Sequence, residues 1–330
     1  MADLVAGLDI GATWLRAALA DLEGRVLFKF SERTARSQEA LEAQLSRLAR
    51  VLAAKARSLG ARLRAVGVGA VGPLDLREGV IVNPPNLPVK RVEVTRALSE
   101  ALEDVPVLVL NDCTAACYGE WLLGAGRGLT NMAYVAIGTG IGGGAVVDGH
   151  LLLGWCGNAV EIGHLVVDAG GRLTCGCGGR GHWEAYCSGA NLPRFLAYWA
   201  SERGISDGEL EAALEKPLQE LTAKDIMAAA KRGTRLALEF LEEVAILNAA
   251  GLASVVNAFS PELLAVGGSV ALENYDLIVE KALVKLADFA FNPVPLVKPA
   301  TFGGEATLMG AVALAIKPPE GLSRVVERAG

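Results

Sequence analysis

The strongest constraint on the fold is a pattern that occurs twice: an apolar strand, a glycine-containing turn and a second apolar strand. The first copy covers residues 4–10 and 15–20, and the second covers residues 132–137 and 144–147. Each copy begins a set of further strands and helices. Such a repeat predicts two related α/β domains. A chain of 330 residues also favours two domains over a single core.

Several other segments have the periodicity of buried strands or of helices with one apolar face. Strands are predicted at residues 65–69, 105–110 and 263–266, and helices at residues 37–60, 114–123, 235–259 and 305–316. Ser37 and Gly60 flank the first of these helices, as capping residues do. The tail after Pro318 is polar, and we predict that it frays.

The charge and hydropathy of the chain exclude some classes of protein. A formal net charge of -6 argues against a nucleic-acid binder that uses a broad basic face. A long uncharged stretch, residues 244–260, contains two asparagines and many small residues, so a buried helix explains it better than a membrane span. Asp3 and Asp9 interrupt what would have to be the apolar part of a secretory signal. We therefore predict no nucleic-acid partner, no membrane partner and a cytoplasmic location.

Residues 138–143 match the dinucleotide-binding pattern G-x-G-x-x-G, but that site needs a helix after the glycines. Here a third adjacent glycine, β-branched residues and the turn at Asp148 follow, and they predict a hairpin. The chain contains no G-x-x-x-x-G-K-[ST] loop either. A glycine hairpin can still bind phosphate, because its backbone N–H groups approach the anion closely and Thr139 adds a hydroxyl. A hairpin that only turns is the alternative, and the presence of two hairpins favours phosphate.

Asp9 ends the apolar strand of the first hairpin, where a carboxylate is unfavourable unless it has a task. We predict that it holds the water shell of a Mg²⁺ ion on ATP, because Mg²⁺ prefers oxygen ligands and keeps several waters. Thr13 and Arg16 could then contact phosphate oxygens. For Arg16, a solvated strand residue is the alternative.

The two hairpins, with the sequences L-D-I-G-A-T-x-x-R and A-I-G-T-G-I-G-G-G, resemble the paired phosphate motifs of the hexokinase and actin superfamily. The resemblance implies an α/β protein with the two-domain actin-like ATPase fold, made of ribonuclease H-like domains with an interdomain cleft for ATP. The implied domains are residues 1–111 with 308–330, and residues 112–307. Ala12 replaces the usual second glycine of the first loop. The implied ATP contacts are Asp9, Gly11, Thr13, Arg16, Gly138, Thr139, Gly140, Gly267 and Gly268, the last two as the adenosine motif.

Residues 161–188 contain E-I-G-H, then C-G-C-G-G-R-G-H and E-A-Y-C-S, followed by Gly189. This run resembles the signature of the ROK family of sugar kinases and repressors: E-x-G-H, C-x-C-G-x-x-G-C and E-x-x-x-S-G. The resemblance extends from the first hairpin to the final helix. Residues 79–88, G-V-I-V-N-P-P-N-L-P, are most similar to the glucokinase branch. The family implies ATP-dependent phosphorylation of a hexose, chiefly glucose, at the 6-hydroxyl.

The resemblance also implies a role for each matching residue. Asp112 would be the general base that takes the proton from the 6-hydroxyl. The other hydroxyls would be hydrogen-bonded by Asn86, Asn111, Glu161, His164 and Glu184, because carboxylates and amides can fix the orientation of a sugar. For Asn111 and Asp112, the local sequence offers an alternative, since both residues are preferred caps of the helix that follows.

The ROK pattern includes a zinc ion held by the histidine of E-x-G-H and three cysteines. The matching residues here are His164, Cys175, Cys177 and His182, with histidine in the fourth position. A Cys₂His₂ set is a recognised tetrahedral zinc site. We therefore predict a structural Zn²⁺ that fixes the loop of the sugar-binding residues. A metal-free loop, and a disulfide involving Cys175 or Cys177, are the alternatives.

Two other functions share part of these motifs. Kinases for N-acetylmannosamine, N-acetylglucosamine or fructose have the same motifs, so the sequence separates them poorly from a glucose kinase. ROK repressors carry a helix-turn-helix domain ahead of the first hairpin. This sequence starts directly with the first strand and is acidic, so we expect no repressor. The resemblance finally implies a homo-oligomer, either a dimer or a tetramer.

Overall fold

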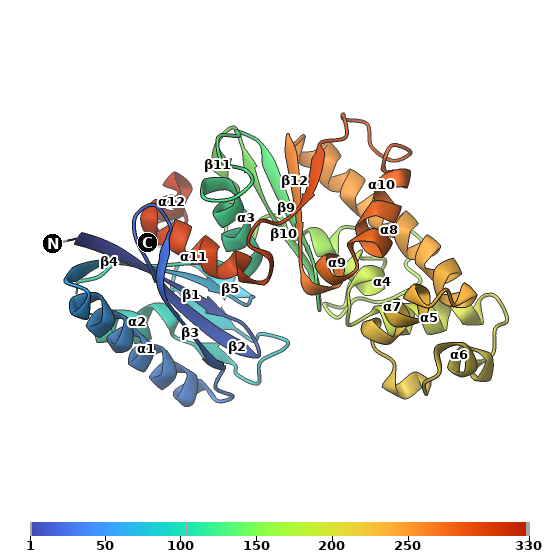
Figure 1. Ribbon diagram of the computed structural model, residues 1–330, viewed down its shortest axis with the longest axis horizontal. Coiled ribbons are helices and arrows are strands. Elements are labelled where there is room, and N and C mark those ends of the chain that lie inside the picture. Colours follow the sequence, from blue (N-terminus) through green and yellow to red (C-terminus); the bar gives the residue numbers. More distant parts are fainter. Residues whose placement is uncertain (1, 103, 328–330) are drawn as a thin grey trace. The chain divides into compact units, whose positions relative to one another are not determined.

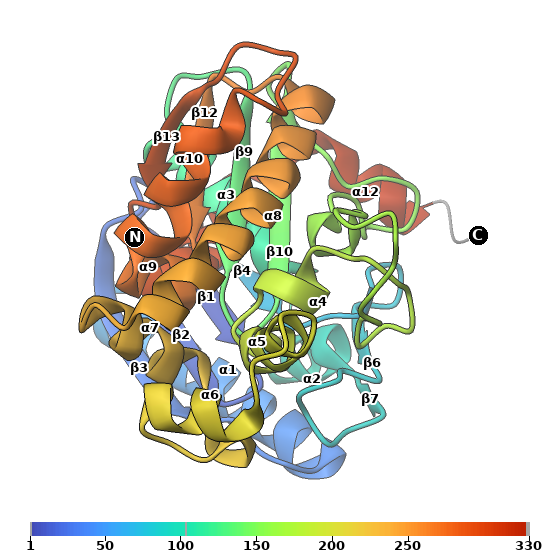
Figure 2. The same ribbon diagram turned by 90° about the vertical axis from the view of Figure 1, so that its right-hand side faces the viewer.

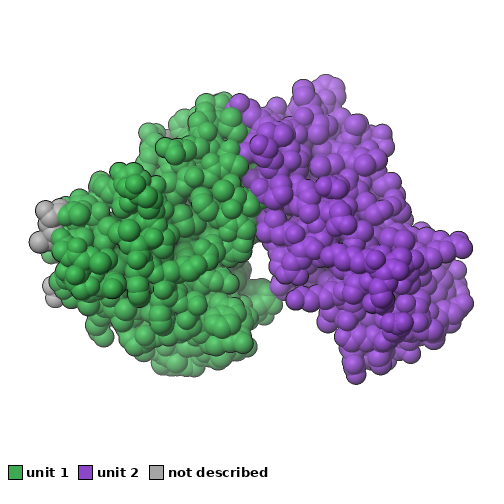
Figure 3. Space-filling view, in the orientation of Figure 1, with its two compact units in different colours: residues 1–134, 144–160, 300–330 green, residues 135–143, 161–299 purple. Residues whose placement is uncertain are grey.

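The computed structural model describes residues 2–102 and 104–327, and it divides into two compact units (Figure 3). Unit 1 comprises residues 1–134, 144–160 and 300–330, and unit 2 comprises residues 135–143 and 161–299. The domain limits inferred from the sequence, residues 1–111 with 308–330 and residues 112–307, stay a prediction. In the described ranges, none of the helices combines the length and the apolar character that a bilayer span requires.

Unit 1 is built on a five-stranded sheet with the order β3-β2-β1-β4-β8. Its strands are β1 (Ala2–Ile10), β2 (Trp14–Ala20), β3 (Val26–Arg33), β4 (Ala61–Ala70) and β8 (Val107–Asn111). The first three strands are antiparallel neighbours, whereas β1, β4 and β8 run parallel. The predicted first hairpin is therefore confirmed as β1 and β2. A small antiparallel sheet adds β5 (Leu74–Asp75), β6 (Val80–Val82) and β7 (Arg91–Val92).

Helices cover both faces of the unit 1 sheet (Figure 1). They are α1 (Gln38–Ser58), α2 (Val94–Leu102), α3 (Asp112–Leu122) and α11 (Ala306–Ile316), while α12 (Glu320–Glu327) contacts β11 (His150–Leu151). Ser37 caps α1 by accepting a hydrogen bond from the Ala40 N–H at 3.3 Å. Gly60, just after this helix, has a φ of +69°, which glycine adopts without strain. Both predicted caps of α1 are confirmed.

The prediction that the tail frays after Pro318 is wrong for the described residues, because α12 forms there. The N–H of Leu322 donates to the Pro319 carbonyl oxygen at 3.0 Å. The Leu322 side chain is only 5% exposed, so packing stabilises a segment whose polar composition concealed it. The part of the predicted tail after residue 327 lies outside the described residues.

Glycines let α11 approach α3 and the sheet closely. A Cβ on Gly310 would lie 1.9 Å from the Ala115 carbonyl oxygen, and one on Gly67 would lie 2.0 Å from the Ala311 carbonyl oxygen. Real Cβ atoms do not come this near, so any larger side chain must push α11 away from α3 or from β4. The lack of a side chain at Gly67 and Gly310 lets α11 pack against the strands that carry the site.

Gly310→Ala is expected to lower the free energy of unfolding by about 3 kcal/mol, because overpacking a tight helix contact displaces backbone atoms. Urea denaturation of the purified protein measures this change. Gly304→Ala is the matched control, since a Cβ there would meet nothing within 4 Å, and its expected effect is below about 0.5 kcal/mol. Equal stability of the two variants would contradict the expected tight contact.

A second five-stranded sheet has the order β11-β10-β9-β12-β13. Its strands are β9 (Met132–Ile137), β10 (Ile141–Val147), β11 (His150–Leu151), β12 (Leu263–Gly267) and β13 (Leu296–Pro299). The predicted second hairpin is β9 and β10. Its glycine turn belongs to unit 2.

Most of unit 2 is helical. Its α-helices are α4 (Glu184–Cys187), α5 (Leu192–Ser201), α6 (Asp207–Leu214), α7 (Ala223–Lys231), α8 (Arg235–Phe259), α9 (Ser269–Glu273) and α10 (Lys281–Leu286). A 3₁₀ turn, η1 (Ile162–His164), precedes α4, and a π-helical turn, η3 (Asp276–Glu280), precedes α10. The predicted long helix is confirmed as α8, which packs against α7 and α10 (Figure 2). Its buried face forms the core on which the loop before α4 is anchored.

Candidate active site

The predicted acidic residues of unit 1 lie together because parallel strands end at the same edge of the sheet. Ile10 of β1 lies opposite Ala70 of β4, and Ala70 lies opposite Asn111 of β8. The turn at Gly11 and the start of α3 are therefore at one edge. Open α/β sheets bind their ligands at the carboxyl ends of parallel strands.

Asp9 is 5% exposed and lies opposite Arg16 in the β1–β2 hairpin. Arg16 Nη1 donates to Asp9 Oδ2 at 2.7 Å. Burial raises the pKa of Asp9 to about 6; Arg16 opposes this rise, and the charge of Asp112 adds to it. Asp9 and Asp112 are thus close enough to influence each other. Arg16 is the ion-pair partner of Asp9, and its contact with phosphate stays a prediction.

Asn111 and Asp112 begin α3. Asn111 Oδ1 accepts hydrogen bonds from the N–H of Cys113 at 2.9 Å and of Thr114 at 3.4 Å, so the capping alternative is confirmed for Asn111. Asp112 Oδ1 accepts from the Cys113 N–H at 2.7 Å. The strand end and the first turn of the helix therefore fix the orientation of the Asp112 carboxylate.

The other predicted residues of unit 1 lie in loops. The Gly11 N–H donates to the Trp14 carbonyl oxygen at 3.0 Å and closes the turn in which Thr13 is exposed. Asn86 is exposed between β6 and β7. Contacts of Thr13 with phosphate and of Asn86 with sugar stay predictions.

Two glycine turns lie side by side in unit 2. Gly268 has a φ of +85°, and a Cβ there would lie 2.4 Å from the carbonyl group of Ile137. A Cβ on Gly138 would lie 3.7 Å from the backbone nitrogen of Ser269. The turn at residues 138–140 and the turn after β12 therefore adjoin through backbone, and backbone without side chains allows a nucleotide to approach closely.

Glu161, His164 and Glu184 come together around η1 and the start of α4. Partial burial of its carboxyl group raises the pKa of Glu161; His164 opposes this rise, and the charge of Glu184 adds to it. Trp183, fully buried, donates from Nε1 to Asn248 Oδ1 of α8 at 2.8 Å. This bond anchors the segment that carries Glu184 on the core of unit 2.

The four predicted metal ligands form one cluster. The donor atoms of His164, Cys175, Cys177 and His182 all lie within 4.8 Å of one another. Cys175 Sγ is 3.8 Å from His164 Nδ1, and Cys177 Sγ is 3.3 Å from His182 Nδ1. Ligand distances of about 2.3 Å for sulfur and about 2.0 Å for nitrogen separate tetrahedral zinc ligands by about 3.3–3.8 Å. The donor set therefore fits zinc with a small contraction.

The chemistry of the cysteines agrees with this geometry. In the described part of the chain, the cysteines form no disulfide, so the disulfide alternative is not seen. Burial raises the pKa of Cys175 to about 11. A bound cation would favour its thiolate instead, since metal ligation stabilises deprotonated sulfur.

Two supporting residues, Asp168 and Tyr186, are not among the residues predicted from the sequence. The Tyr186 hydroxyl donates to Asp168 Oδ2 and accepts from the Leu173 N–H at 2.9 Å. Asp168 Oδ2 also accepts from the Arg172 N–H at 3.0 Å. These bonds shape the loop just before Cys175. An aspartate and an arginine four residues apart were the only local sign of them.

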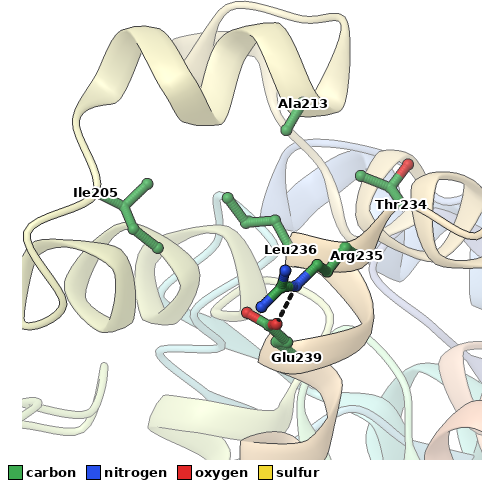
Figure 4. Close-up of a pocket in the computed structure, with 6 residues that line it drawn as sticks. All are labelled: Ile205, Ala213, Thr234, Arg235, Leu236 and Glu239. Carbon is green, nitrogen blue, oxygen red and sulfur yellow. Dashed lines mark hydrogen bonds and ion pairs between the residues drawn. The ribbon is translucent and has the colours of Figure 1, made fainter.

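A pocket elsewhere in unit 2 (Figure 4) is separate from these residues. It is lined by Ile205, Ala213, Thr234, Arg235, Leu236 and Glu239. Arg235 Nε donates to Glu239 Oε1 at 2.6 Å along α8. None of the six is a predicted site residue, and the pocket enters no step of the chemistry proposed below.

Paired glycine hairpins on an α/β framework, with a carboxylate at a strand end, define the actin-like ATPase fold. The model of the ROK family matches residues 5–318, and the chain belongs to this family. It is 41% identical to a glucokinase of Pyrobaculum calidifontis, over 96% of this chain and 97% of that protein. Two solved structures are 32% identical and cover 94% of this chain: a ROK glucokinase from Streptomyces griseus with glucose and AMPPNP (TM-score 0.74, 99% of that chain) and a ROK hexokinase from Thermus thermophilus (TM-score 0.78, 98% of that chain).

Proposed function

We propose that this chain is an ATP-dependent hexose kinase with glucose as its main substrate. One observation carries the proposal: similarity over nearly the whole chain to a protein named glucokinase, together with the fold of a glucokinase solved with glucose and AMPPNP. Phosphoryl transfer requires mainly positioned phosphates, a proton acceptor and charge neutralisation. The chain offers candidates for each of these.

Asp112 is the proposed general base. Its carboxylate takes the proton of the sugar 6-hydroxyl while that oxygen bonds to the γ-phosphorus, and the bond from the γ-phosphorus to the bridging oxygen breaks to release ADP. Asp9 would hold the water shell of the Mg²⁺ on ATP, and the ion would neutralise phosphate charge. Support for Asp112 comes from its strand-end position and its influence on Asp9.

The remaining roles follow the two sets of predicted residues. The hexose would be oriented by Asn86, Asn111, Glu161, His164 and Glu184. ATP would lie against Gly11, Thr13, Arg16, Gly138, Thr139, Gly140, Gly267 and Gly268. The adjoining glycine turns support the second set, since backbone without side chains lets phosphate oxygens approach closely.

The four clustered donors would hold one structural Zn²⁺. They are the side chains of His164, Cys175, Cys177 and His182. Bound zinc would tie η1 to the loop before α4 and so keep Glu161 and Glu184 in place. The four donors support this by their separation. A cytoplasmic location and a homo-oligomer, dimer or tetramer, complete the proposal.

Purified protein with Mg²⁺ and ATP is expected to phosphorylate glucose with a kcat/KM at least about tenfold above that for fructose, N-acetylglucosamine or N-acetylmannosamine. A site that hydrogen-bonds the hydroxyls of one sugar discriminates strongly against a sugar that lacks or replaces one of them. A coupled ADP-release assay across this panel measures the preference. Higher kcat/KM for an N-acetyl sugar would favour the alternative kinases. Inactivity on every hexose with ATP, ADP or polyphosphate as donor would refute the proposal.

A further inference from the structure

Glu184 makes a contact that sugar binding does not explain. Its Oε2 atom accepts a hydrogen bond from the backbone N–H of Ile141 at 2.8 Å. Ile141 follows directly on the glycine turn of residues 138–140. A Cβ on Gly140 would lie only 2.6 Å from the same Oε2 atom, so the carboxylate packs directly against the turn.

The residues that follow α4 hold the other side of this turn. The Gly189 N–H donates to the Gly138 carbonyl oxygen at 2.8 Å, and the Ala190 N–H donates to the Thr139 carbonyl oxygen at 3.1 Å. Three hydrogen bonds therefore connect residues 184–190 to the turn, at Gly138, Thr139 and Ile141. Only the bond from Ile141 depends on a side chain.

The two carboxylate oxygens of Glu184 face different partners. Oε2 is engaged by the Ile141 N–H, whereas Oε1 lies 3.8 Å from Cys175 Sγ in the metal cluster. Glu184 also follows His182 by two residues, and Trp183 between them is anchored on α8. Glu184 thus links the metal-bearing loop to the glycine turn within unit 2.

We propose that Glu184 is a positioning residue for the glycine turn that receives the nucleotide phosphates, in addition to its predicted contact with the sugar. This inference rests on the proposed function. Oε2 fixes the turn at Ile141, and Oε1 remains for a sugar hydroxyl. A hydrogen bond to a charged acceptor is stronger than one between neutral groups, so its loss leaves the turn less ordered before ATP arrives.

The test is binding of Mg²⁺-AMPPNP in the absence of sugar, measured by calorimetry. A residue that contacts only sugar does not change this affinity. Glu184→Ala is expected to weaken nucleotide binding about tenfold, the effect of one lost charge-assisted hydrogen bond. Glu161→Ala is the matched control, since it removes a neighbouring predicted sugar carboxylate, and its nucleotide affinity is expected to equal that of the wild type.

Glu184→Gln separates the two roles. Its amide oxygen can still accept from the Ile141 N–H, while the amide nitrogen replaces the acceptor offered to sugar. Nucleotide affinity is therefore expected to fall by no more than about threefold, because the bond is kept but loses its charge, and the KM for glucose is expected to rise. Zinc content of each variant is measured alongside, by elemental analysis.

Three outcomes overturn the inference: Glu184→Ala binds AMPPNP like the wild type, Glu161→Ala weakens binding equally, or Glu184→Ala loses zinc and regains affinity when zinc is restored. The last outcome would assign the effect to the metal loop. Failure of the wild type itself to bind AMPPNP or to phosphorylate a hexose would instead refute the proposed function.

Discussion

Asp112→Asn is expected to lower kcat for glucose phosphorylation by about 10³-fold, while the dissociation constant for glucose changes less than about threefold. An asparagine has the shape of aspartate but cannot accept the proton of the 6-hydroxyl, and a positioned base contributes roughly 10²–10⁴-fold to such reactions. A coupled kinase assay gives kcat, and calorimetry with glucose gives the dissociation constant.

The local structure makes this substitution a clean test. Asp112 Oδ1 accepts a hydrogen bond from the Cys113 N–H, and an asparagine oxygen can accept the same bond. The cap of α3 comes from Asn111, which is unchanged. Asp148→Asn is the matched control, because Asp148 lies in a turn with a φ of 51° that asparagine also tolerates. Near-normal turnover of Asp112→Asn would rule out its assignment as the base.

Much of the fold was predictable because its signals are local. Glycine turns between apolar strands predicted both hairpins, and the apolar stretch of α8 has the bounds expected from the sequence. The short elements β5, β6 and β7 have too few residues to show a period. The helix α12 was missed because its composition is polar, and packing at Leu322 stabilises it.

The contacts of the site also differ in how far the sequence predicts them. His164, Cys175, Cys177 and His182 were predictable as a set because a motif with fixed spacing brings them together, and the structure places them in one cluster. The hydrogen bond from Ile141 to Glu184 joins residues far apart in the sequence. Neither residue type indicates that pairing, so only the folded chain shows it.

The loop around the metal cluster has no large apolar core of its own. Cys177 and Arg180 are exposed, and among the described residues the loop is closed mainly by hydrogen bonds and two isolated β-bridges, one between Val166 and His182 and one between Thr174 and Arg180. Such a segment is held weakly by packing. Zinc would therefore contribute much of its order.

His182→Ala is expected to weaken zinc binding by at least about 100-fold, since even residues that only support a metal ligand contribute 10–100-fold. His182→Cys is expected to retain one zinc per chain, because thiolate is also a preferred ligand. His150→Ala is the matched control, for His150 is exposed and outside the cluster. Chelator competition and elemental analysis measure the affinity and stoichiometry. Under the proposal that zinc orders the loop of Glu161 and Glu184, glucose binding is expected to fall with zinc loss in His182→Ala and to survive in His182→Cys. The contradicting result is a wild-type protein with far less than one zinc per chain that still binds and phosphorylates glucose normally. It would show that the four donors hold the loop without a metal.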